Sequence, residues 1–170
     1  MDADFFPEAN RNWTCFQRWL DISNHERGVT WCSLDAPTFE HGDIRAADFP
    51  AEEFRRRLEE QGRLRPYSVG DFYPLTGYSF GADAWMAFQF DRPDLGEGAV
   101  LAFRRDQSPY SSATVRLRGL APDAQYRLEF ADTGEERVAS GAELSAGLTL
   151  TIGKERESLL IWYERIGGTS

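Results

Sequence analysis

The second half of the chain is a succession of short apolar or alternating segments, and this pattern constrains the fold more than any other feature. In Tyr126–Phe130 the apolar residues alternate with Arg127 and Glu129, which is typical of a strand with one buried face and one solvated face. Turn residues such as Asp132-Thr133-Gly134 separate the segments. The other segments of this kind are 85–90, 99–103, 114–118, 148–152 and 159–163. Short strands at this spacing predict a mostly β fold, an antiparallel β-sandwich.

One α-helix is predicted, over residues 48–64. Asp48 can cap its first turn and Pro50 suits the first helical position. Ala51, Phe54 and Leu58 form a narrow apolar stripe, and Gly62 can end the helix. The chain is therefore expected to divide into an N-terminal β-hairpin segment (1–46) packing on the sandwich, the helix (47–66) and a C-terminal β-sandwich domain (67–170).

The charge balance excludes some classes of partner. The 170 residues carry a formal net charge of −9, and phosphate binding needs a basic face, so nucleic acid is not expected as a partner. No stretch approaches the ~20 apolar residues of a membrane span, and the acidic N-terminus does not resemble a signal peptide. These features predict a cytoplasmic protein that does not bind a membrane.

Neither a metal site nor a cofactor is expected. Cys15, His25, Cys32 and His41 could ligate zinc by residue type, but their spacing matches no standard zinc pattern. The two cysteines lie in apolar strand patterns, which leaves open whether they are buried thiols or a disulfide.

The sequence assigns no catalytic residue. It contains no G-x-S-x-G motif for a nucleophilic serine. A glycosidase needs two carboxyl groups flanking the scissile bond. Asp71 with Asp83 or Asp91 is the pair to consider, but turns and strand edges explain such residues equally well.

Aromatic residues offer a better lead to a ligand. Tyr73, Tyr78 and Trp85 cluster in sequence around Asp71, and sugar rings can lie on aromatic faces while polar groups bind their hydroxyls. We therefore take Asp71, Tyr73, Tyr78 and Trp85 as candidate carbohydrate-binding residues. The alternative is that these rings belong to the core or to a domain interface.

Residues 51–165 resemble the end of melibiase-type α-galactosidases and related glycoside hydrolases. The resemblance rests on matched blocks in the same order: 63–67, 70–76, 83–93, 96–98, 102–105, 118–120, 132–134 and 161–163. It implies that residues 51–64 correspond to the last helix of a (β/α)₈ barrel and that the rest is the β-domain that follows. The catalytic aspartates of the family lie on earlier barrel strands, so none can be carried over.

Residues 11–44 resemble a different part of another family, the β-rich C-terminal region of α-mannosidase-type hydrolases. The blocks that carry this resemblance are 12–14, 17–24, 28–31 and 34–37. The metal and nucleophile residues of that family also lie outside the matched segment.

These observations predict a non-catalytic accessory module of an α-galactosidase-like glycoside hydrolase. It would support a barrel, contacting it or another protein through the Phe54/Leu58 face of the helix, or help to hold carbohydrate. The alternatives are a stand-alone carbohydrate-binding module and a small glycosidase that uses Asp71 with Asp83 or Asp91.

Overall fold

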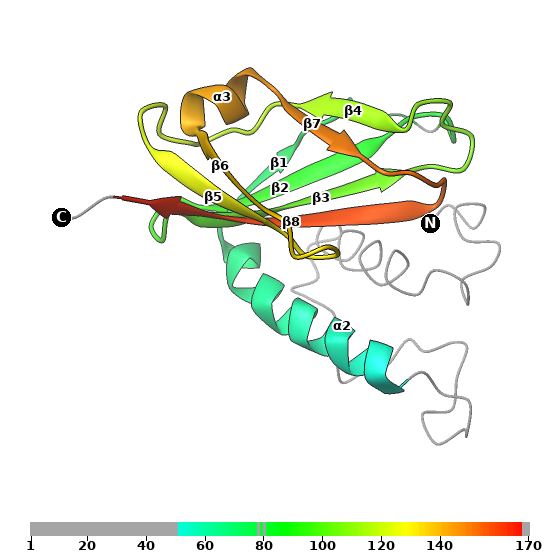
Figure 1. Cartoon of the computed structure of the whole chain (residues 1–170), viewed down its shortest axis with the longest axis horizontal. Helices are drawn as coiled ribbons and strands as arrows, with labels where there is room; N and C mark the ends of the chain where they lie inside the picture. Colours follow the sequence, from blue (N-terminus) through cyan, green and yellow to red (C-terminus); the bar gives the residue numbers. More distant parts are fainter. Residues whose placement is uncertain (1–50, 78, 80, 168–170) are drawn as a thin grey trace.

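The computed structural model describes residues 51–77, 79 and 81–167, and antiparallel strands dominate this part of the chain (Figure 1). In chain order the elements are α2 (Ala51–Leu64), the 3-10 helix η3 (Arg65–Val69), β1 (Asp71–Pro74), β2 (Met86–Arg92), β3 (Glu97–Arg104), β4 (Ser112–Val115), β5 (Gln125–Phe130), β6 (Glu136–Ser140), α3 (Gly141–Ala146), β7 (Leu148–Thr151) and β8 (Glu157–Ile166). The predicted N-terminal hairpin, Cys15, His25, Cys32, His41 and the start of the predicted helix lie outside the described residues.

The strands form two sheets that pack face to face. The larger sheet has six strands in the order β1-β2-β3-β8-β5-β6, and the smaller consists of β4 and β7. Between them lies an apolar core to which the alternating segments contribute, with members that include Val100, Val115, Leu128, Leu150 and Ile161. The prediction of an antiparallel β-sandwich is confirmed.

The central strands of the large sheet are apolar on both faces. In β3 the consecutive residues Ala99, Val100, Leu101, Ala102 and Phe103 are each at most 1% exposed. One face of this strand lies in the core between the two sheets. The other face belongs to a second apolar cluster, which contains Phe88, Phe90, Ala99, Leu101, Phe103, Leu160 and Trp162 together with Leu64 and Tyr67 from α2 and η3.

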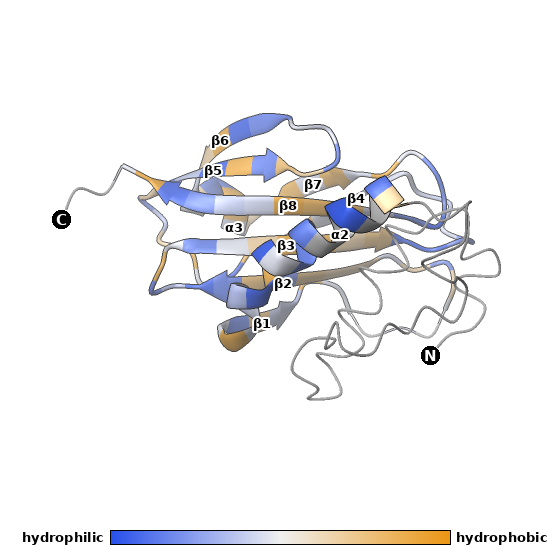
Figure 2. Cartoon of the chain, turned by 90° about the horizontal axis from the view of Figure 1, so that it is seen from below, coloured by the Kyte–Doolittle hydropathy of each residue, from blue (hydrophilic) through white to orange (hydrophobic). Residues whose placement is uncertain are grey.

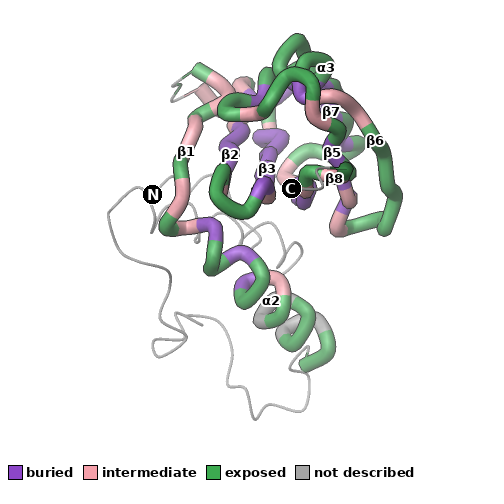
Figure 3. Tube along the Cα trace, turned by 90° about the vertical axis from the view of Figure 1, so that its left-hand side faces the viewer, coloured by how far each residue is buried: buried purple, intermediate pink, exposed green. Residues whose placement is uncertain are grey.

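The helix α2 lies on the side of the large sheet opposite to α3 and the small sheet (Figure 1). Its C-terminal end approaches the sheet and its N-terminal end diverges from it, as Figures 1 and 3 show. The helix runs past Gly62, the predicted stop, and gives way to η3 at Arg65. Pro66 explains this position, because it has no backbone N–H with which to continue the α-helical hydrogen bonds.

Four described elements were not predicted from the sequence: η3, β1, β6 and α3. The short helix α3 depends on a capping box, in which the Ser140 hydroxyl accepts a hydrogen bond from the Glu143 backbone N–H (3.2 Å) and the Glu143 carboxylate accepts one from the Ser140 backbone N–H (2.8 Å). The strand predicted over 114–118 is observed as β4, Ser112–Val115. No helix in the described part of the chain is long and apolar enough to cross a membrane.

Candidate functional site

A polar groove lies between the C-terminal end of α2 and the large sheet. Strand register explains how the sheet side of this groove forms: Glu164 of β8 lies opposite both Glu97 of β3 and Arg127 of β5, and Trp162 lies opposite Glu129. Directly paired residues project from the same face of a sheet, so these side chains form two adjacent rows. Figure 2 shows the corresponding change along β8, from hydrophobic to hydrophilic toward its arrowhead.

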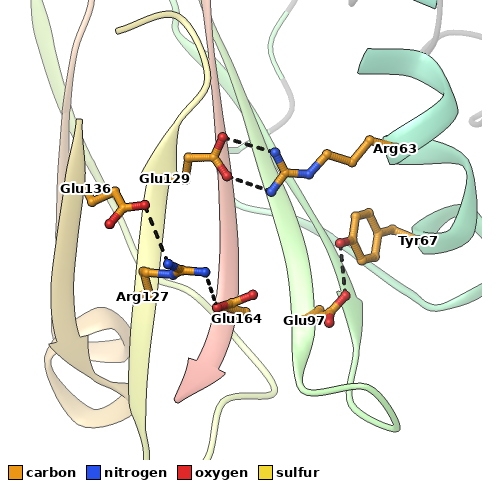
Figure 4. Close-up of polar contacts among 7 residues, drawn as sticks. All are labelled: Arg63, Tyr67, Glu97, Arg127, Glu129, Glu136 and Glu164. Carbon is orange, nitrogen blue, oxygen red and sulfur yellow. Dashed lines mark hydrogen bonds and ion pairs between the residues drawn. The ribbon is translucent and has the colours of Figure 1, made fainter. Parts of the chain in front are cut away.

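Arg63, in the last turn of α2, joins the helix to the sheet. Its guanidinium donates two hydrogen bonds to the Glu129 carboxylate, at 3.1 Å to Oε1 and 2.7 Å to Oε2 (Figure 4). The same guanidinium lies 4.3 Å from the ring centre of Trp162, within range of a cation–π contact. The hydrogen bond from Arg63 lowers the pKa of the Glu129 carboxyl. Glu129 therefore stays ionised, and the bidentate pair fixes the approach of the helix.

Three further contacts complete the polar wall of the groove (Figure 4). The Tyr67 hydroxyl donates a hydrogen bond to Glu97 Oε2 at 3.2 Å. Burial, the Glu97 charge and this hydrogen bond together raise the pKa of Tyr67 to about 12. The Arg127 guanidinium donates to Glu164 Oε1 at 2.5 Å and lies 3.6 Å from Glu136 Oε1.

The groove has two neighbouring compartments. The smaller, of about 140 Å³, is lined by Arg63, Tyr67, Glu97, Arg127, Glu129, Trp162, Tyr163 and Glu164. The larger, of about 480 Å³, extends along α2 and is lined by Arg56, Glu59, Glu60, Arg63, Glu129, Ala131, Asp132 and Trp162. Arg63, Glu129 and Trp162 line both compartments, so the two are neighbours at the point where the helix meets the sheet.

This arrangement suits binding better than acid–base catalysis. A sugar hydrolase needs one carboxyl group whose pKa is raised so that it can donate a proton. In the groove, the pKa of Glu129 is lowered, and Glu97 and Glu164 each accept a hydrogen bond from a neighbouring side chain. Within the described residues, no group of three or more His, Cys, Asp or Glu side chains is arranged to hold a metal ion.

The candidate carbohydrate-binding residues do not lie in this groove. Asp71 and Tyr73 are together on β1, where the Tyr73 hydroxyl donates a 3.1 Å hydrogen bond to Asp71 Oδ2. Trp85 is 8% exposed, belongs to the core between the sheets and donates from Nε1 to the Tyr110 carbonyl at 2.9 Å. Trp85 is therefore a core residue, the alternative that the sequence left open, and Tyr78 lies outside the described residues. Carbohydrate binding by the set stays a prediction.

The candidate carboxylate pairs are arranged differently from one another. Asp71 lies directly opposite Asp91 in the β1–β2 register, whereas Asp83 precedes β2 at the other end of that strand. Asp71 is exposed, but Asp91 is only 3% exposed and accepts a 2.6 Å hydrogen bond from the Tyr163 hydroxyl. A substrate could not reach the Asp91 carboxylate in this arrangement.

The groove residues were not singled out from the sequence. In the sequence, Arg127 and Glu129 are the polar residues that alternate with apolar ones in a predicted strand. This alternation indicated only that their side chains share the solvated face of the sheet. Arg63 and Tyr67 come from a different part of the chain, and no local pattern indicates that they meet these strands.

The described fold is that of an antiparallel β-sandwich domain with a helix on the outer face of its large sheet. Residues 85–162 match the family model of the glycosyl hydrolase family 36 C-terminal domain. This match confirms the resemblance to the C-terminal β-domain of α-galactosidase-like hydrolases. The resemblance of residues 11–44 to α-mannosidase-type hydrolases lies outside the match and stays a prediction.

Solved structures of α-galactosidases share the fold. The galactosidase domain of an α-galactosidase–sucrose kinase gives a TM-score of 0.58 at 22% identity, covering 72% of this chain and 17% of that chain. In Geobacillus stearothermophilus, a variant of α-galactosidase AgaA in complex with raffinose gives 0.57 at 21% identity, and AgaB gives 0.57 at 23%, with the same coverage. The chain thus spans about 17% of the length of these proteins. A search of curated proteins gave no significant match.

Proposed function

We propose that this chain is a non-catalytic accessory β-domain of an α-galactosidase-like glycoside hydrolase, which packs against a catalytic barrel and supports it. The observation that carries the proposal is the match of residues 85–162 to the C-terminal domain of glycosyl hydrolase family 36. The chain covers about 17% of each of these α-galactosidases, which agrees with a role as one domain of such an enzyme.

The geometry of the described part agrees with an accessory role in two ways. Glu129 and Glu164 of the groove are held in ion pairs, and Asp91 of the Asp71/Asp91 pair is buried, and neither arrangement favours glycoside hydrolysis. Leu64 of α2 and Tyr67 of η3 pack on the apolar outer face of the large sheet, so the helix is joined to the β-domain through a buried cluster. By resemblance, α2 corresponds to the last barrel helix, so the partner would be the barrel.

The Phe54/Leu58 face of α2 is the proposed contact with that partner. These two side chains lie outside those that the structure describes, so the face is tested by substitution. We expect the isolated chain to self-associate through an uncovered apolar face. The double variant Phe54→Ser/Leu58→Ser should reduce self-association in sedimentation experiments without lowering the melting temperature below that of a control.

The matched control is Glu52→Ser/Arg55→Ser, which introduces two serines at exposed positions of the same helix. It should lower helix propensity similarly and leave self-association unchanged. A Phe54→Ser/Leu58→Ser variant that is much less stable than this control, with unchanged association, would mean that the two residues pack inside the chain and are not a docking face.

A carbohydrate-binding module is the second candidate function. The observation that favours it is the exposed Asp71 next to Tyr73 on β1, which places a carboxylate beside an aromatic ring on an edge strand. Trp85 is buried, so its ring is not available to a sugar together with Tyr73. A sugar that binds here should change the chemical shifts of the Asp71 and Tyr73 signals in an NMR titration.

A further inference from the structure

Two glutamates of the groove lie side by side. Glu97 of β3 and Glu164 of β8 are direct cross-strand partners on the same face of the sheet. Cβ atoms of such partners are about 4.5–5.5 Å apart, and like charges at this distance destabilise a sheet. A chain that keeps this pair at the floor of an open groove retains two adjacent acceptors there.

The surroundings of the pair leave hydrogen-bonding capacity for a ligand. Glu97 accepts one hydrogen bond from Tyr67, and Glu164 accepts one from Arg127. A carboxylate has about four lone-pair sites and a guanidinium has five N–H donors, so each group can make further bonds. The side chains of Arg127 and Glu164 are 45% and 43% exposed, which makes these sites accessible.

The space above the pair is large enough for a small molecule. The compartment of about 140 Å³ over Glu97 and Glu164 lies next to the compartment of about 480 Å³ beside α2, and Arg63 lines both. The larger compartment alone lies within the ~300–1,000 Å³ range of small-molecule sites. Its walls come from the helix and from the sheet, so a ligand would contact both.

We propose that this groove binds a neutral saccharide, with hydroxyls donating to Glu97 and Glu164 and a ligand oxygen accepting from Arg127. Hydroxyls both donate and accept, which suits adjacent carboxylates and a guanidinium. An anion would meet the repulsion of Glu97, Glu129 and Glu164, and an apolar molecule would leave these groups unpaired. The choice of a saccharide rests on the proposed function, whereas the site rests on the geometry of the groove.

The test is a titration of the isotope-labelled whole chain with galactose and with raffinose, followed by two-dimensional NMR. We expect saturable shifts at the Arg127 and Arg63 side chains and at the Trp162 indole. Arg127→Ala should weaken binding about tenfold, because a hydrogen bond from a charged donor is lost. Arg55→Ala is the matched control, since Arg55 forms an ion pair with Glu52 on the same helix and does not line the groove.

Glu97→Gln separates a ligand role from a structural one. Glutamine can still accept the hydrogen bond from Tyr67, and it removes the repulsion with Glu164. We therefore expect a melting temperature equal to or above that of the wild type, together with weaker saccharide binding. Saccharide binding by the groove is overturned if neither sugar causes saturable shifts there, or if the shifts occur only at Asp71 and Tyr73. It is also overturned if Arg127→Ala and Glu97→Gln bind the sugars as the wild type does. None of these results would affect the proposed accessory role, which the Phe54→Ser/Leu58→Ser variant and its control test separately.

Discussion

Asp91 is a buried carboxylate in a network that joins β2, β8 and the loop before β5. The Tyr163 hydroxyl donates to Asp91 Oδ1 at 2.6 Å and lies 2.9 Å from the amide nitrogen of Gln89. The Gln89 amide also bonds the backbone of Arg118, donating to its carbonyl and accepting from its N–H, both at 2.8 Å. Asp91 Oδ2 has no hydrogen-bond partner among the described residues. The network therefore fixes the loop but leaves half of a buried carboxylate unsatisfied.

Burial raises the pKa of Asp91, the hydrogen bond from Tyr163 opposes this, and the charges of Asp71 and Asp94 add to the rise. The folded chain consequently holds this proton to a higher pH than the unfolded chain does. Stability from this group is present at low pH and is lost as the pH rises through the folded pKa. We predict that Asp91→Asn, which does not titrate, gains stability relative to the wild type between about pH 3 and pH 7.

Urea unfolding of both proteins across this pH range measures the effect, because the difference between their unfolding free energies isolates the carboxyl group. Asp83→Asn is a control at an exposed aspartate. A difference for Asp91→Asn that stays constant with pH, or falls as the pH rises, would contradict the assigned cause.

At the scale of elements, β3 and β8 contact each other so closely at Gly98 that a side chain at this position has no room. A Cβ atom on Gly98 would lie 2.2 Å from the Tyr163 ring and hydroxyl and 2.3 Å from the Phe90 carbonyl oxygen. Gly98 is the register partner of Tyr163, so the glycine creates the space that the tyrosine ring fills. The buried network of Tyr163 therefore depends on a glycine in the neighbouring strand.

We predict that Gly98→Ala destabilises the chain by about 1–3 kcal/mol or more, because the added methyl overpacks the sheet. Gly62→Ala is the matched variant, since a Cβ there meets nothing within 4 Å and Gly62 lies inside α2. It should stabilise the helix by about 0.5–1 kcal/mol. Thermal and urea unfolding measure both changes. If the two variants were equally stable, Gly98 would have room for a methyl group and the explanation would be wrong.

At the scale of the whole molecule, the strands that alternate or are wholly apolar were predictable because each carries its own periodicity. The apolar run 99–103 indicated a central strand, and β3 is buried on both faces. By contrast, β6 has mostly exposed residues and β1 is a short edge strand, so neither has an alternating apolar face to read. The helix α3 has only six residues and is stabilised by its cap, so it is too short to show a helical repeat of apolar residues.

The site was less predictable than the fold, for a physical reason. Aromatic residues in sequence indicate either a ligand platform or a core, and only packing distinguishes the two, as the burial of Trp85 illustrates. The groove depends on the register of three strands and on the approach of α2, which brings Arg63 to Glu129 across 66 positions of sequence. Contacts of this range follow from tertiary structure and leave no local pattern.

The central claim is that the chain is an accessory domain without a catalytic centre of its own, and hydrolysis of an aryl α-galactoside by the purified chain tests it most directly. The account predicts no release of the aryl group above the buffer rate, and the same result for Asp71→Asn, because Asp71 has no accessible carboxylate partner in the described sheet. Turnover by the wild-type chain that is abolished in Asp71→Asn would contradict the account and establish a glycosidase that uses Asp71.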